Sequence, residues 1–118
     1  MKKPMLQNLL IVEDNPSMRR LIKSVVKDLA VNIHECEDGA EALDAYETHH
    51  PEWILMDVEM KEKDGFTATR EIVEAHPNAK ILILTKYGTE RMREEAQKAG
   101  ASEYVLKENL LTIREMLH

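Results

Sequence analysis

Four short runs of apolar residues divide the chain: LLIV at 9–12, WILM at 53–56, ILIL at 81–84 and YVL at 104–106. The runs are continuous rather than alternating, which is typical of parallel β-strands that are covered on both faces. A further segment, NIHEC at 32–36, alternates between apolar and polar residues and is expected to form an edge strand. The chain therefore predicts a parallel sheet lying between layers of helices.

Amphipathic segments between these runs predict the helices. The first begins at Asn15, a favourable N-cap, and Pro16, which is favoured at the first helical position. Its apolar residues recur at spacings of three and four and form one stripe: Met18, Leu21, Ile22, Val25, Val26 and Leu29. Further helices are expected at about 39–48, 65–75, 89–98 and 109–117, with Asp38, Asp64 and Thr89 as caps. Five strands alternating with five helices predict a doubly wound α/β fold.

Length and charge limit the classes of function. The 118 residues suit one domain spanning 1–118. The net charge of −6 argues against direct nucleic-acid binding, because such binding begins by neutralising phosphates. No apolar stretch reaches the length of a membrane span, so no membrane association is expected. Cys36 is the only cysteine, which favours a buried thiol in a reducing, cytoplasmic compartment.

Polar side chains stand where the predicted strands end. Glu13 and Asp14 follow the first strand, Asp57 the third, Thr85 the fourth and Lys107 the fifth. Parallel strands bring their carboxyl ends to the same edge of a sheet, where ligands usually bind. Clustered carboxylates repel one another, so the cluster is expected to hold a cation. Oxygen ligands without His or Cys favour Mg²⁺, which usually takes further ligands from a phosphate.

These residue types also suit phosphoryl chemistry. A carboxylate beside a bound magnesium ion can attack a phosphorus centre, because the metal offsets the repulsion between two anions. Lys107 offers a positive charge to the phosphoryl oxygens, and Thr85 offers a hydroxyl donor. The sequence therefore favours acceptance of a phosphoryl group at this edge.

The chain resembles the response-regulator receiver family of two-component signalling. The matching segments are IVEDNPSMRRLI, ILMDVEMKEKDGF, ILILT and GASEYVLK, which occur in the family's order and cover nearly all of the chain. The resemblance implies a flavodoxin-like, five-stranded parallel sheet of order 2-1-3-4-5. It also implies that Asp57 is the phosphoacceptor. Mg²⁺ would then be held by Glu13, Asp14, Asp57 and the main-chain carbonyl of Glu59.

The same resemblance implies a phosphorylation-dependent switch. Lys107 would pair with the phosphoryl group, the hydroxyl of Thr85 would turn toward it, and Tyr104 would swing inward. The phosphoryl donor would be a sensor histidine kinase or a phosphotransfer protein. The surface of the fourth helix, fifth strand and fifth helix would pass the signal to an output domain or protein, and it could also form a dimer. Such a domain catalyses its own phosphorylation and dephosphorylation rather than the turnover of external substrates.

Several positions depart from the family's pattern. Lys61 and Glu108 stand where Pro is common, and the isomer of the peptide bond before Glu108 is left open. Lys86 replaces a residue that is usually small. It either pairs with Glu59 over the entrance, which would slow phosphoryl entry and hydrolysis, or both side chains are solvated. Tyr87 either flanks the hydrolytic water or packs on the surface.

Other functions are compatible with parts of the pattern. A flavin-binding module of the same fold is disfavoured, because Glu13 and Asp14 would repel the flavin phosphate. A magnesium-dependent phosphatase of the haloacid-dehalogenase type needs a longer chain. A phosphorylation-independent docking module remains an alternative, as does either a stand-alone receiver or one excised from a longer protein. The histidines lack metal-ligand spacing: His34, His49, His50, His76 and His118.

Overall fold

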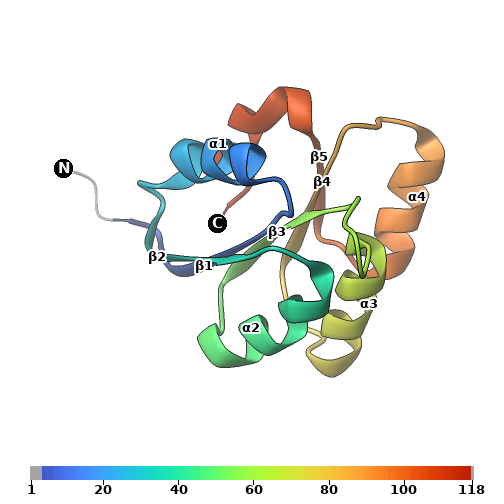
Figure 1. Ribbon diagram of the computed structural model, residues 1–118, viewed down its shortest axis with the longest axis horizontal. Helices are drawn as coiled ribbons and strands as arrows, with labels where there is room; N and C mark the ends of the chain where they lie inside the picture. Colours follow the sequence, from blue (N-terminus) through green and yellow to red (C-terminus); the bar gives the residue numbers. More distant parts are fainter. Residues whose placement is uncertain (1–3, 118) are drawn as a thin grey trace.

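The computed structural model describes residues 4–117 and contains one parallel sheet. Its five strands follow the order β2-β1-β3-β4-β5, which confirms the predicted order (Figure 1). The strands are β1 (Leu6–Val12), β2 (Ala30–Cys36), β3 (Trp53–Asp57), β4 (Ile81–Thr85) and β5 (Glu103–Leu106). In the register of the sheet, Val12 pairs with Cys36 and Met56, and Thr85 pairs with Leu106. The carboxyl ends of the strands therefore meet along one edge.

Helices connect every pair of consecutive strands. They are α1 (Pro16–Val26), the 3₁₀ helix η1 (Gly39–Glu41), α2 (Ala42–His49), α3 (Gly65–Ala75), α4 (Glu90–Ala99), the 3₁₀ helix η2 (Lys107–Thr112) and α5 (Ile113–Met116). The predicted caps are confirmed, because four side chains accept a main-chain N–H in the first turn of α1, η1, α3 and α4: Asn15, Asp38, Asp64 and Thr89. Short polar side chains thus fix where these helices begin.

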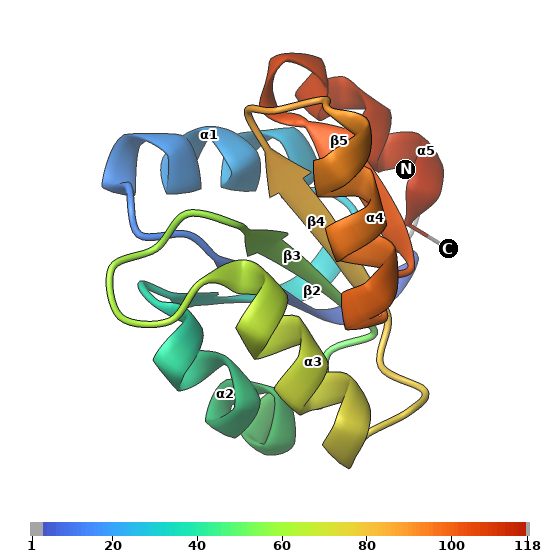
Figure 2. The ribbon, with the colours of Figure 1, turned by 90° about the vertical axis from the view of Figure 1, so that its right-hand side faces the viewer.

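The helices form two layers, one on each face of the sheet. Figures 1 and 2 show α1 and the C-terminal helices on one face, and α2, α3 and α4 on the other. Each face has its own apolar core: Ile22, Val26 and Ile113 pack beneath the first layer, whereas Ala42 and Ile72 pack beneath the second. The strands are buried from both sides, which explains their continuous apolar runs.

The last predicted helix differs from the expectation. Residues 109–117 do not form one α-helix: η2 is a 3₁₀ helix with a non-helical Asn109 (φ −119°, ψ 43°), and only Ile113–Met116 is α-helical. Leu110 and Ile113 are both buried, and a 3₁₀ helix places residues three apart on the same side. The apolar side chains of this segment therefore pack into the core although the segment is not a continuous α-helix. The peptide bond between Lys107 and Glu108 is trans.

Two further details refine the predicted helices. Leu21, which the sequence assigns to the buried stripe of α1, is 49% exposed, because Ile22 and Val26 carry the contact with the sheet. Cys36 is buried at the end of the edge strand β2, as predicted. Within residues 4–117, the helices are too short or too polar to cross a membrane.

Candidate functional site

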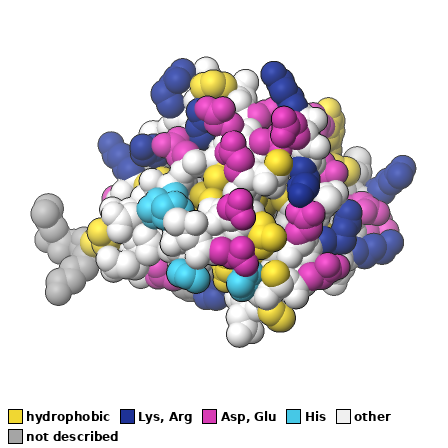
Figure 3. All heavy atoms as spheres, turned by 60° about the horizontal axis from the view of Figure 1, so that its bottom comes forward, with side chains coloured by type: hydrophobic (Ala, Val, Ile, Leu, Met, Phe, Trp, Pro, Cys, Tyr) yellow, Lys and Arg dark blue, Asp and Glu magenta, His cyan; other side chains and the backbone are white. Residues whose placement is uncertain are grey.

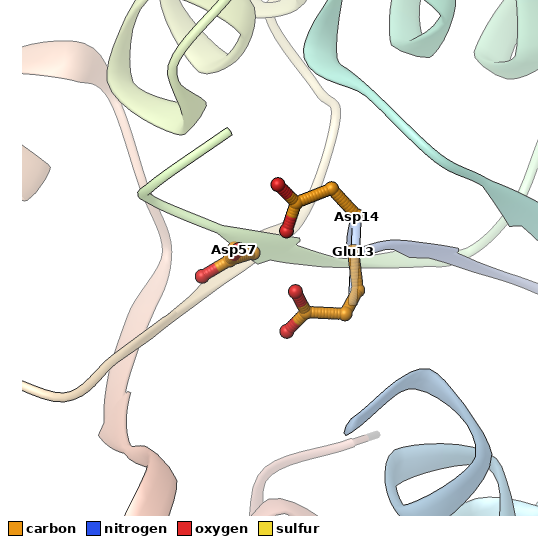
Figure 4. Close-up of side chains that lie close together, drawn as sticks. All are labelled: Glu13, Asp14 and Asp57. Carbon is orange, nitrogen blue, oxygen red and sulfur yellow. The ribbon is translucent and has the colours of Figure 1, made fainter. Parts of the chain in front are cut away.

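Three carboxylates lie together at the carboxyl edge of the sheet. Glu13 and Asp14 extend from the end of β1 and Asp57 from the end of β3 (Figure 4). Each offers a carboxylate oxygen, and these oxygens all lie within 4.8 Å of one another. Glu13 is 1% exposed and Asp57 is 3% exposed. The ends of two apolar strands thus place one carboxylate each in an environment that is almost free of water.

Lys107 joins two of these carboxylates. It follows β5 directly, and its Nζ lies 2.7 Å from Asp57 Oδ1 and 2.9 Å from Glu13 Oε1. Glu13 Oε1 is buried and makes no hydrogen bond of good geometry with a described residue, so the ion pair with Lys107 is its main polar contact. One ammonium group therefore serves two buried carboxylates.

The crowding perturbs the acid–base equilibria of the site. Burial raises the pKa of Glu13, and the adjacent Asp57 raises it further against the opposing effect of Lys107. Burial likewise raises the pKa of Asp14, and Glu13 adds to the increase. Burial of the ammonium would lower the pKa of Lys107, but hydrogen bonds with Asp57 and Glu13 outweigh it and raise the pKa. Burial is thus the main reason why the pKa values of Glu13 and Asp14 are raised, and the neighbouring carboxyl groups add to it.

The donor set fits a hard divalent cation. Glu13, Asp14 and Asp57 offer carboxylate oxygens as ligands. A bound cation would reduce the repulsion among these carboxylates and would favour the ionised forms of Glu13 and Asp14, whose pKa values are raised. Glu59 follows in the β3–α3 loop and lines the same pocket, with its side chain exposed to solvent. The residues that the sequence assigns to magnesium are thus placed around one space.

Thr85 and Tyr104 are linked through the β4–α4 loop. Thr85 is buried at the end of β4, and its hydroxyl accepts the main-chain N–H of Tyr87 at 3.1 Å. The Tyr104 hydroxyl donates to the main-chain carbonyl of Tyr87, and its ring lies beneath Arg93 of α4 at 5.2 Å. Burial raises the pKa of the Tyr104 hydroxyl. Tyr87 therefore contacts both predicted switch residues through its main chain, while its side chain is exposed.

An open pocket of about 420 Å³ leads to the carboxylates. Glu59 and Lys86 are exposed at this pocket, and no ion pair joins their side chains. The effect of Glu59 and Lys86 on phosphoryl entry and hydrolysis stays a prediction. Met18 and Leu21 of α1 form an apolar wall of this pocket, and Met18 also packs against the core as the sequence predicts.

Sequence reasoning missed the residues that hold the site's backbone. Arg19 of α1 donates through Nη1 to the main-chain carbonyl of Glu13 at 2.7 Å, and its Nε bonds Glu35 of β2 at 3.2 Å. Asp38, predicted only as a cap, also accepts main-chain N–H groups from the β3–α3 loop. The sequence feature that could have indicated this role is the position of Arg19 beside Met18, at the start of the apolar stripe of α1. No local pattern distinguishes the second role of Asp38.

The histidines lie apart from this site. His34 and His49 stack at 3.7 Å between ring centroids, and His76 contacts Glu47 at 2.9 Å. Figure 3 shows histidine and acidic side chains side by side on the face that carries α2 and α3. Among residues 4–117, no histidine joins a group of three or more metal-ligating side chains, and His118 lies outside the described residues.

Comparison with known proteins agrees with this geometry. The response regulator receiver domain family matches residues 9–118. The chain is 36% identical over 104 residues to the chemotaxis protein CheY of Bacillus subtilis, covering 87% of each chain. It is 35% identical over 103 residues to CheY of Halobacterium salinarum, covering 87% of this chain and 86% of that one.

Solved structures give the same result. A two-component response regulator of the LuxR family from Aurantimonas sp. has a TM-score of 0.84 and 27% identity, covering 93% of this chain and 84% of that one. The receiver domain of the histidine kinase CKI1 from Arabidopsis thaliana, complexed with Mg²⁺, has a TM-score of 0.79 and 25% identity, covering 98% and 96%. The fold, the acidic edge and these similarities lead to one conclusion: the chain belongs to the response regulator receiver domain family of two-component signalling.

Proposed function

We propose that this receiver domain is a phosphorylation-dependent signalling switch that accepts a phosphoryl group on Asp57. The observation that carries the proposal is the convergence at one sheet edge. Asp57 lies within 4.8 Å of the carboxylates of Glu13 and Asp14, and 2.7 Å from Lys107 Nζ. The donor would be a phosphohistidine on a sensor kinase or phosphotransfer protein. A cytoplasmic location belongs to the same proposal.

The chain's own residues divide the work of the transfer. A carboxylate oxygen of Asp57 attacks phosphorus as the P–N bond of the phosphohistidine breaks, and the imidazole leaves with the bonding electrons and takes up a proton. Glu13, Asp14, Asp57 and the Glu59 carbonyl would hold Mg²⁺, which offsets the repulsion between the carboxylate and the incoming phosphoryl oxygens. The receiver domain of CKI1, which is complexed with Mg²⁺, supports magnesium as the bound ion.

Lys107 and Thr85 would convert the transfer into a conformational change. The Lys107 ammonium already contacts Asp57, and the Thr85 hydroxyl can turn its proton toward a phosphoryl oxygen. Since Lys107 is already paired, the newly formed charge-assisted bond is the one from Thr85, and at about 1.5–3 kcal/mol it supplies part of the ~5.5 kcal/mol that reverses a two-state population. The main chain of Tyr87 forms hydrogen bonds with both Thr85 and Tyr104, so a movement of Thr85 would change the position of Tyr104. The affected surface would be that of α4, β5 and α5, which would bind the output or a second copy.

Labelling with a small phosphodonor tests this proposal. The protein is incubated with an acyl phosphate, with magnesium or with EDTA, and its intact mass is measured. We expect one phosphoryl group per chain in the presence of magnesium, none after Asp57→Asn, and normal labelling after Asp44→Asn, which changes an exposed carboxylate on α2. Labelling that persists in Asp57→Asn would show that another residue accepts the phosphoryl group. A wild-type chain that accepts no phosphoryl group from either an acyl phosphate or a kinase would favour the phosphorylation-independent docking module.

A further inference from the structure

The loop between β3 and α3, residues 58–64, is closed tightly at its base. It starts directly after Asp57 and includes Glu59, whose carbonyl belongs to the proposed magnesium site. Gly65 N donates to the carbonyl of Val58 at 2.8 Å, and a Cβ on Gly65 would overlap the carbonyl oxygen of Asp57. The two ends of the loop are thus in contact, so the course of the loop depends on what holds its outer part.

Asp38 holds that outer part from a different connection of the fold. Its side chain follows β2 and accepts the main-chain N–H of Glu62 at 2.9 Å and that of Lys63 at 3.2 Å. The adjacent Gly39 lies so close to the loop that a Cβ there would overlap the carbonyl oxygen of Lys63. The β2–α2 connection and the β3–α3 loop are therefore fixed to each other by one carboxylate and one close backbone approach.

This bonding exceeds what a helix cap requires. The cap is complete when Asp38 Oδ1 accepts the N–H of Ala40 at 2.8 Å. Burial alone would raise the pKa of Asp38, but the three main-chain donors lower it, so the side chain is a carboxylate at neutral pH. Hydrogen bonds to an ionised acceptor are about twice as strong as neutral ones, and here two of the three extend to the loop.

We propose that Asp38 is a positioning residue for the magnesium site, because it fixes the β3–α3 loop that carries the Glu59 carbonyl. The inference rests on the proposed function, since it assigns a role within the same site. Asp38 does not need to touch the metal. Partners that orient metal ligands typically change metal affinity by about 10–100-fold when they are removed.

Two other roles of Asp38 must be separated from positioning. Asp38 lines a hollow of about 250 Å³ together with Asp14 and Glu37, so removing its charge also changes the local field. Glu37→Gln removes a charge from the same hollow at a side chain that is 78% exposed, and serves as the charge control. Thr89→Ala removes the cap of α4 away from this loop, and serves as the cap control.

The first measurement requires no metal. Amide hydrogen exchange is followed by NMR in the metal-free wild type, Asp38→Ala, Asp38→Asn and the two controls. In Asp38→Ala the amides of Glu62 and Lys63 are expected to exchange at least about tenfold faster, because each loses a charge-assisted acceptor. The controls are expected to exchange at wild-type rates at both positions. Unchanged exchange in Asp38→Ala would show that Asp38 does not hold the loop.

The second measurement is a magnesium titration monitored by amide chemical shifts. The dissociation constant is expected to rise about tenfold or more in Asp38→Ala, to rise less in Asp38→Asn, which keeps one acceptor oxygen, and to stay at the wild-type value in both controls. If Glu37→Gln loses as much magnesium affinity as Asp38→Ala, the effect is due to charge and not to positioning of the loop. If Asp38→Ala binds magnesium with wild-type affinity, this inference is wrong, but the proposed function is not affected. Absence of magnesium binding in the wild type would instead overturn the proposed function and this inference together. If Asp38→Ala does not fold, Asp38→Asn decides by the same two measurements.

Discussion

Replacing Asp14 by Asn is expected to stabilise the metal-free fold. Oxygens of Asp14 and Asp57 lie within 4.8 Å of each other, and burial together with Glu13 raises the pKa of Asp14. At that separation Coulomb's law gives a repulsion of about 1 kcal/mol in water and about 3–4 kcal/mol at an effective dielectric constant near 20. Asn keeps the size of the side chain and removes the repulsion.

The net gain is smaller than the larger of these figures. Glu13 precedes Asp14 in the chain, so their repulsion persists after unfolding and largely cancels. Lys107 also lies close to the cluster and offsets part of the negative charge. We therefore expect Asp14→Asn to raise the unfolding free energy of the metal-free protein by about 1–2 kcal/mol. This corresponds to an increase of roughly 3–10 °C in the unfolding midpoint for a domain of this size.

Urea unfolding monitored by circular dichroism measures the effect. In EDTA at neutral pH the variant should be more stable than the wild type, and excess magnesium should narrow the difference, because only the wild type retains the full ligand set. Asp44→Asn serves as the control for removing an exposed acid. An Asp14→Asn variant that is no more stable than the wild type in EDTA would refute the reasoning from crowded carboxylates.

The same charges determine the pH dependence of the metal-free wild type. Glu13 and Asp14 have raised pKa values, so the folded state binds more protons than the unfolded state above their ordinary values of 4.5 and 3.8. Stability then falls as the pH rises from these values through the raised ones. Acidification from neutral pH is therefore expected to stabilise the wild type in EDTA, and to do so less in Asp14→Asn.

Two further predictions concern residues that shape or tie the fold. Gly65→Ala should destabilise the protein by about 1–3 kcal/mol in urea unfolding, because the new Cβ meets backbone, whereas Gly88→Ala should have less effect because it meets only the flexible side chain of Leu106; equal effects would contradict this. Arg114 lowers the pKa of Asp28 to about 2, so this pair stabilises the fold above the unfolded value of 3.8 and is lost as the pH falls toward 2. Arg114→Leu should weaken that loss, and an unchanged acid-unfolding curve would contradict the assignment.

The sheet could be predicted because its strands are marked twice in the sequence. Four of the five are continuous apolar runs, β2 being the alternating exception, and a charged or hydroxyl side chain stands at the end of the run, as at Asp57 and Thr85. Continuous apolar runs favour parallel strands buried on both faces, and the meeting of their carboxyl ends follows from general rules for such sheets, whereas the strand order came from the family resemblance. The roles assigned to Asp57, Thr85 and Lys107 came from the family resemblance and remain predictions.

The errors concern features that depend on distant contacts. Apolar spacing near the C-terminus is compatible with α- and 3₁₀-helical turns, and the packing of Leu110 and Ile113 against the sheet and α1 selects between them. The sequence predicts Asp38 as a cap because the N–H that it accepts in that role belongs to Ala40, two residues away. Its partners in the loop, Glu62 and Lys63, are 24 and 25 residues away. Arg19 acts on a main-chain carbonyl, and the identity of Glu13 gives no indication of that contact. Side chains that hold backbone groups leave little trace in local sequence.

The charge balance of the site gives a physical reason to expect magnesium dependence. Three carboxylates meet a single closely paired ammonium, and two of the carboxylates are almost fully removed from water. The proposed phosphorylation of Asp57 would replace one negative charge with a group that carries about two, so it would increase the excess of negative charge at the site. A divalent cation would offset about two of these negative charges. The crowding that is expected to weaken the metal-free fold would therefore also make the proposed phosphoryl acceptance depend on a bound cation.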